Sequence, residues 1–179
     1  MFSTANTPKI YVACLASYNA GILHGDWIDL DGSEALEDRI SEILDASPEE
    51  DAEEWAVHDH EFCGHLSEYA GTDTLNAIQE AFEKVEAEGM DWEVFCEYCA
   101  HLGHKIEAGQ VEMFSEAYTG TVDTLEGWCT EFLEETGQLE SIPDNLRHYF
   151  DYAAFARDME INDVFMIRHN GDRLVFWHR

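Results

Sequence analysis

Acidic residues are concentrated in one long stretch of this chain. Between Ile40 and Leu146 there are 28 Asp and Glu residues but only two basic residues, Lys84 and Lys105. This stretch of 107 residues carries a net charge of −26, out of −30 for the whole chain of 179 residues. Such a field repels nucleic acid and anionic membranes, and it attracts a partner that presents a positively charged channel. DNA is the usual occupant of such channels.

The size of the charge permits a direct comparison with a duplex. B-DNA carries one phosphate charge per roughly 1.7 Å of its axis, so about 30 charges correspond to on the order of 50 Å, or about 15 base pairs. Solvated helix faces and adaptation to high salt are the alternative explanations of the charge. Salt adaptation acidifies a whole surface, whereas residues 147–179 are neutral, with five acidic and five basic residues.

The composition indicates a folded protein despite this charge. Disordered chains lack apolar and aromatic residues, but here 45% of residues are hydrophobic and 12% are aromatic. No stretch approaches the roughly 18 apolar residues of a membrane span, and the N-terminus lacks the pattern of a signal peptide. Five scattered cysteines fit free thiols in a reducing compartment. We therefore expect a soluble, cytoplasmic protein that binds neither membranes nor nucleic acid.

The N-terminal part reads as a small sheet with one helix. Alternating apolar residues and turn signals predict strands at Ile10–Asn19, Ile22–Leu30 and Glu54–His60. Between the second and third strands we expect a helix that opens near Asp31 or Ser33 and ends before Pro48.

The middle of the chain has the periodicity of amphipathic helices. Apolar residues recur every three or four positions from Asp73, the expected cap, to Glu88, and again between Asp91 and Gly103. Two further helices are predicted at Val111–Tyr118 and Thr124–Glu135. Each helix buries one face and displays carboxylates on the other. The candidate partner-binding carboxylates are Glu80, Glu83, Glu88, Glu93, Glu97, Glu112, Glu116, Asp123, Glu126, Glu131, Glu134 and Glu135.

The C-terminal part is mixed. One helix is expected to begin at Pro143, with Leu146, Tyr149, Phe150 and Ala153 on its apolar face. Strands at Val164–His169 and Arg173–His178 flank Asn170-Gly171, a strong signal for a type I′ hairpin. The chain is thus predicted to be α+β, with domains at residues 8–63, 64–108 and 109–179. The candidate dimer contacts are Tyr149, Phe150, Tyr152 and Phe155.

Two clusters suggest metal or acid–base chemistry, but both have simpler explanations. Cys96 and Cys99, followed by His101 and His104, resemble zinc ligands, although helical spacing places both thiols in the apolar stripe of one helix. The His58-Asp59-His60 segment alternates across a strand, so its side chains cannot converge unaided. Nucleophile motifs, phosphate-binding Gly-rich loops and HExxH are absent. We predict no catalytic activity, no cofactor and no metal.

Three blocks of sequence resemble a known family. Ile10–Leu30, followed by Glu54–Asp59, is similar to the opening of the ArdA antirestriction proteins. Glu131–Met159 resembles the C-terminal stretch of the same family, and Phe114–Leu125, with its Ala-Tyr-x-Gly core, is also similar. The resemblance extends from about Ile10 to Trp177 and is weakest between residues 62 and 109.

This resemblance implies a specific function. Members of the family come from mobile genetic elements and inhibit type I restriction-modification enzymes as DNA mimics. They are elongated, three-part α+β proteins that dimerise through the C-terminal part and display carboxylates like the phosphates of bent DNA. We therefore expect a homodimeric, non-catalytic antirestriction protein that occupies the DNA channel of the methyltransferase core. The alternative hypothesis is a metal-binding module or enzyme that uses the Cys96–His104 cluster.

Overall fold

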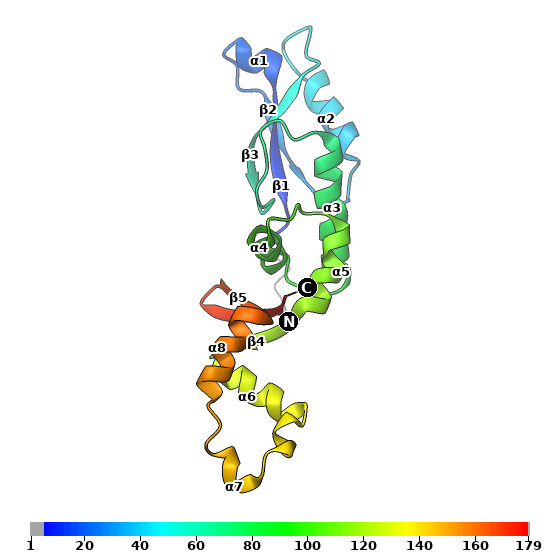
Figure 1. The fold of residues 1–179 in the computed structure, drawn as a ribbon. Coiled ribbons are helices and arrows are strands. Elements are labelled where there is room, and N and C mark those ends of the chain that lie inside the picture. Colours follow the sequence, from blue (N-terminus) through cyan, green and yellow to red (C-terminus); the bar gives the residue numbers. More distant parts are fainter. Residues whose placement is uncertain (1–5, 179) are drawn as a thin grey trace. The chain divides into compact units, whose positions relative to one another are not determined.

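The computed structural model describes residues 6–178 and has the predicted α+β character. Helices alternate with two three-stranded antiparallel sheets (Figure 1). The chain separates into two compact units, one up to Phe114 and one from Ser115 onward. The finer division at residues 63 and 108 stays a prediction. Within the described part of the chain, no helix is both long enough and apolar enough to span a membrane.

The first sheet is formed by β1 (Lys9–Cys14), β2 (Gly25–Asp29) and β3 (Trp55–Glu61), in the order β2-β1-β3. The predicted first strand is too long, because its second half forms the short helix α1 (Leu15–Asn19). Alternation of apolar residues ends at Cys14, and the next turn of chain buries Ser17 completely. The Ser17 hydroxyl lies 2.8 Å from that of Ser47, and this hydrogen bond ties α1 to a loop 30 residues further along the chain.

Helix α2 (Leu36–Asp45) covers one face of this sheet. Its inward residues Leu36, Ile40 and Ile43 are buried. The helix begins later than predicted, because Asp31 and Ser33 form a turn of their own in which the Ser33 amide donates to Asp31 Oδ1 at 2.9 Å.

Helices α3 (Thr72–Ala87) and α4 (Trp92–Leu102) follow the predicted periodicity. The α3 residues Leu75, Ile78, Ala81, Phe82 and Val85 are buried. The residue that caps α3 is Gly71, not Asp73 as predicted, and Asp73 lies in the first turn. Both predicted ends of α4 are confirmed: Asp91 accepts a hydrogen bond from the Val94 amide at 3.1 Å, and Gly103 adopts the left-handed conformation.

The next helix, α5 (Ala108–Ala117), begins three residues before the predicted start. It buries Val111 and Phe114, and the Phe114 ring contacts that of Phe95 with centroids 5.5 Å apart. Tyr118, predicted as the last residue of this helix, instead opens β4 (Tyr118–Val122), a strand that the sequence did not predict. Pairing with a strand far along the chain decides its conformation.

The second sheet has the order β4-β6-β5, with β5 at Val164–His169 and β6 at Asp172–Trp177. The predicted hairpin is confirmed. Asn170 and Gly171 have φ values of 51° and 94°, as the two central residues of a type I′ turn require.

Helices α6 (Leu125–Glu135) and α8 (Tyr152–Asn162) pack with this sheet around a second core. That core contains Leu125, Cys129, Ala156, Met159, Val164 and Val175. Between the two helices lie the 3₁₀ helix η1 (Gln138–Ser141) and the short helix α7 (Asp144–Arg147) (Figure 1).

The single helix predicted from Pro143 is wrong. The chain leaves helical geometry after α7, and Asp151 opens α8 by accepting a hydrogen bond from the Ala154 amide at 2.9 Å. A side-chain cap inside the apolar pattern thus separates two helices that periodicity alone joins.

Candidate functional site: carboxylates on the helix faces

The acidic side chains of the protein lie at its surface. Of the 39 Asp and Glu residues, Glu49, Asp91, Glu93 and Glu97 are half-buried, and the other 35 are exposed. This distribution follows from solvation, because an ionised carboxylate loses far more free energy on burial than a hydrogen bond or ion pair readily returns. The folded chain therefore keeps its negative charge in contact with water and with any partner.

Helix α3 shows how packing directs this charge outward. Its apolar side is buried, whereas Glu80, Glu83 and Glu88 are exposed as predicted. The Glu83 carboxylate accepts a hydrogen bond from Gln79 one turn earlier, at 3.3 Å. The helix therefore holds these carboxylates at fixed spacing along a surface, as a flexible acidic tail does not.

The acidic surface of α3 continues onto the segment before and within α2. The Asn76 amide donates to Glu37 of α2 at 3.1 Å, which brings the two helices together. Gly32, in the loop before α2, lies beside the Glu83 carboxylate and has a φ of 77°, a left-handed conformation that favours glycine. We define the α2–α3 acidic surface by Asp31, Glu37, Glu80 and Glu83.

Hydrogen bonding lowers the pKa of Asp31, one carboxylate of this surface. The Ser33 side chain and amide both hydrogen-bond the Asp31 carboxylate and hold its pKa below its usual value. Asp31 therefore stays ionised to lower pH than a free aspartate. Asp31 and Glu37 were not predicted as site residues, because both precede the stretch in which acidic residues are concentrated.

Helix α4 departs from the predicted arrangement of its carboxylates. Glu93 and Glu97 are half-buried rather than fully exposed. The helix buries Trp92, Val94, Phe95, Tyr98 and Cys99, so its apolar side is wider than the predicted stripe. Glu93 also accepts a hydrogen bond from the Asn6 side chain. These two carboxylates are thus less available to a partner than those of α3.

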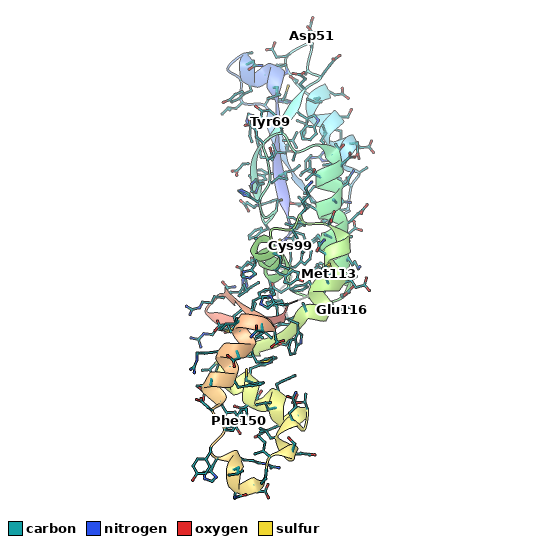
Figure 2. The ribbon with its side chains drawn as sticks, viewed as in Figure 1. Asp51, Tyr69, Cys99, Met113, Glu116 and Phe150 are labelled. Carbon is teal, nitrogen blue, oxygen red and sulfur yellow. The ribbon has the colours of Figure 1, made fainter. Side chains whose placement is uncertain are left out.

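The remaining candidate carboxylates are exposed. Glu112 and Glu116 lie on α5, and Asp123 precedes the Thr124 cap of α6. Glu126, Glu131, Glu134 and Glu135 lie on α6. Further exposed acids that were not predicted as site residues include Asp51, in the loop between α2 and β3 (Figure 2). Charge density along the sequence is the signal that would have found them.

The predicted dimer residues differ in their surroundings. Tyr149 is 76% exposed, whereas Phe150, Tyr152 and Phe155 are half-buried. Phe150 lies in the segment between α7 and α8 (Figure 2). Its ring contacts those of Tyr152 and Phe155 on α8, with centroids 4.9 and 5.9 Å away. Because Phe155 also packs against the second core, Tyr149 is the residue of this group most available for contact with another chain.

The cysteine and histidine cluster does not have the properties of a metal centre. Burial raises the pKa of the Cys99 thiol to about 12 and that of Cys96 in the same direction. Thiols of this kind stay protonated at neutral pH and are therefore poor nucleophiles. His101 and His104 are exposed. Across residues 6–178, no three His, Cys, Asp or Glu side chains are grouped so that they could hold a metal ion.

The His58-Asp59-His60 segment of β3 does not converge on one point. The His58 ring packs edge-on against Tyr18, with centroids 4.7 Å apart. Asp59 Oδ1 accepts a hydrogen bond from the His60 amide at 2.8 Å, and Asp59 itself is exposed. These contacts account for the segment without an acid–base role.

Comparison with known families identifies the chain. The family model described as "Antirestriction protein (ArdA)" matches residues 10–172, which is most of the sequence. The chain belongs to the ArdA family. Membership implies an antirestriction function directed at restriction-modification enzymes, in a family of inhibitors rather than catalysts. A search of curated protein sequences finds no match.

Proposed function

We propose that this ArdA protein inhibits type I restriction-modification enzymes by occupying the DNA channel of their methyltransferase core. The observation that carries this proposal is the exposure of 35 of the 39 carboxylates, including those of α2, α3, α5 and α6, helices that bury apolar residues on another face. A channel shaped for a polyanion binds these carboxylates in place of phosphates. The inhibition requires no bond making or breaking.

Two physical terms favour this binding, and the second distinguishes the protein from a duplex. Long-range attraction between a protein of charge −30 and a cationic channel raises the rate of encounter. The carboxylates of α3 and α6 are held by packed helices, whereas a duplex must be deformed to fit a bent channel at a cost of several kcal/mol. The inhibitor therefore competes with DNA without that deformation.

A competition assay tests the proposal directly. A labelled duplex bound to a type I methyltransferase is titrated with the protein at several salt concentrations. We expect the protein to displace the duplex, with a log Kd that rises steeply with log salt concentration because several ionic contacts are made. Failure to displace DNA at any salt concentration, while the protein remains folded, would overturn the proposal.

The contribution of individual carboxylates should be small. Replacing Glu80 or Glu83 alone with glutamine is expected to weaken inhibition less than about threefold, because exposed ionic contacts contribute little individually. Abolition of inhibition by either substitution, with the thermal unfolding temperature unchanged, would contradict a distributed charge-matching mechanism.

We further propose that the protein acts as a homodimer joined through the segment around Tyr149. An aromatic ring that is 76% exposed beside Phe150 is suited to contact with a second copy. Sedimentation should give a dimer for the wild type and a shift toward monomer for Tyr149→Asp. Tyr69→Asp is the matched control, because Tyr69 is also 76% exposed but belongs to the first unit. A wild-type monomer at micromolar concentration would refute this arrangement.

A further inference from the structure

The first sheet has a face that α2 does not cover. In β1, Ile10 and Val12 are buried, whereas Lys9 and Tyr11, which alternate with them, are only half-buried. The buried side faces α2, because Arg39 of that helix pairs with Asp26, the residue opposite Val12. Lys9 and Tyr11 therefore lie on the other side, which we call the outer sheet face.

Strand register identifies the rest of this face. Directly opposite residues of antiparallel strands project to the same side. Trp27 and Asp59 lie opposite Tyr11 on the two neighbouring strands, and Asp29 and Glu61 lie opposite Lys9. The outer sheet face thus consists of Lys9, Tyr11, Trp27, Asp29, Asp59 and Glu61.

The two aromatic rings form a fixed platform. Tyr11 and Trp27 meet edge to face, with centroids 5.7 Å apart and an interplanar angle of 67°. Both are half-buried, so part of each ring stays accessible. A Cβ on Gly25 would lie 3.0 Å from Tyr11 Cε1, so the glycine leaves room for the ring close to β2.

Lys9 shows which chemical group this platform accepts. Its Nζ lies 5.1 Å from the centroid of the Trp27 ring and 2.9 Å from Glu61 Oε2. A cation is thus held between an aromatic face and a carboxylate. Three carboxylates against one ammonium group leave two negative charges on the outer sheet face, and Asp29 and Asp59 are both exposed.

We propose that the outer sheet face binds an arginine side chain of the target enzyme. The guanidinium would stack on the exposed part of the Trp27 and Tyr11 rings and pair with Asp29 or Asp59. Arginine fits better than lysine, because its planar, weakly hydrated group both stacks on rings and forms bidentate contacts with carboxylates. This inference rests on the proposed function, in which the partner presents a basic protein surface.

Such a contact would add a localised stacking interaction to the distributed ionic contacts of the carboxylates. Tryptophan, tyrosine and arginine are the residues that most often dominate binding energy in protein interfaces. Salt weakens contacts between exposed charges but has much less effect on a stacked, desolvated ring. The outer sheet face is therefore expected to account for a growing share of the affinity as the salt concentration rises.

Variants of the platform test this anchor in the complex with a type I methyltransferase. We expect Trp27→Leu to weaken binding about tenfold and Trp27→Phe to retain part of the affinity. Tyr69→Leu is the control for loss of an exposed aromatic ring outside this face and should change the Kd less than twofold. The loss of affinity caused by Trp27→Leu should persist at high salt concentration. Equal Kd values for Trp27→Leu and Tyr69→Leu would overturn the inference.

Two further measurements distinguish loss of the aromatic contact from unfolding of the variant and from failure of the proposed function. Thermal unfolding of each variant must match the wild type within a few degrees, and Trp27→Phe serves as the folded reference if Trp27→Leu is destabilised. If the wild type displaces DNA and Trp27→Leu does so equally well, the inference fails while the proposed function stands. If the wild type does not displace DNA, the proposed function itself fails.

A peptide titration tests the chemistry without the enzyme. Tetra-arginine and tetra-lysine are added to the isotope-labelled protein, and the indole N–H signal of Trp27 is followed by NMR. We expect a larger shift with tetra-arginine than with tetra-lysine. We also expect tetra-arginine to bind Lys9→Gln more tightly than Lys105→Gln, because Lys9 itself lies over the Trp27 ring and both variants have the same net charge. Equal shifts with both peptides, no shift with either, or equal binding by both variants would overturn the assignment.

Discussion

The two sheets of the protein use their faces differently. In the first, one face packs against α2, while the other keeps Tyr11 and Trp27 partly accessible among carboxylates. In the second, both faces carry buried apolar residues: Val175 points into the core with α6 and α8, and Phe176, on the opposite face, has no exposed surface.

This difference assigns different tasks to the two sheets. A sheet with two buried faces stabilises its surroundings and offers little to a partner, whereas an uncovered face with rings and charges favours recognition. The charges agree with this division. The outer face of the first sheet is negative, whereas the end of the second carries Arg168 opposite Arg173.

The largest difference is expected in stability. Phe176→Ala should lower the free energy of unfolding by about 3–5 kcal/mol, because it removes a fully buried ring and leaves a cavity. Tyr11→Leu should cost under about 1.5 kcal/mol, since the ring is half-buried and leucine retains much of its apolar contact. Urea denaturation measures both. Similar costs would mean that the outer face of the first sheet is packed as tightly as the second sheet.

A second difference is expected in binding. Neutralising the α2–α3 acidic surface should weaken inhibition of a type I methyltransferase about tenfold to a hundredfold. The variant replaces Asp31 with asparagine and Glu37, Glu80 and Glu83 with glutamine. The slope of log Kd against log salt concentration should also become shallower, because four ionic contacts with the partner are removed. The matched control neutralises four exposed acids of the second unit and produces the same net charge. These are Asp158, Glu160, Asp163 and Asp172.

The control variant should lose less than about threefold in inhibition. If both sets of substitutions weaken inhibition equally, total charge rather than its placement governs binding. In that case the contrast between the first unit and the end of the chain carries no functional meaning.

Local chemistry made part of the fold predictable from sequence. Asp91 and Gly103 set the ends of α4, and Asn170-Gly171 sets the hairpin, because each acts through its own backbone or its nearest neighbours. The exposed carboxylates of α3 were predictable for a similar reason, since one helical period separates buried from exposed positions.

Tertiary context decided what the sequence did not predict. Strand β4 depends on pairing with β6, and α1 replaces strand where Ser17 becomes buried. Glu93 and Glu97 were expected to be exposed, but α4 is buried over a wider arc than its own periodicity implies. The outer sheet face was not predictable either. Its membership depends on strand register, which shifts between Tyr11 and Val12.

A smaller effect is expected at the cap of α6 in the second unit. Thr124 accepts a hydrogen bond from the Gly127 amide at 3.1 Å, so Thr124→Ala should lower the free energy of unfolding by about 1 kcal/mol. Thr74→Ala is the control in the first unit, because Thr74 lies in the first turn of α3, whose cap makes no side-chain hydrogen bond. If Thr74→Ala lowers the free energy of unfolding as much as Thr124→Ala, the hydrogen bond at the α6 cap does not account for the loss of stability.

The smallest expected effect concerns Asp31 in the first unit. Ser33→Ala removes the hydroxyl that lowers the pKa of Asp31, so this pKa should rise toward its ordinary value in an NMR titration. A lowered pKa stabilises the fold above the unfolded-state pKa, and this contribution is lost as pH falls through the folded-state value. The wild type should therefore be slightly more stable than Ser33→Ala at pH 7, and the difference should disappear as pH falls through the folded-state pKa of Asp31. Ser41→Ala, an exposed position on α2, should show neither change. A stability difference that persists unchanged below the folded-state pKa of Asp31, as measured in the NMR titration, would mean that Ser33 stabilises the loop by packing rather than through the ionised carboxylate.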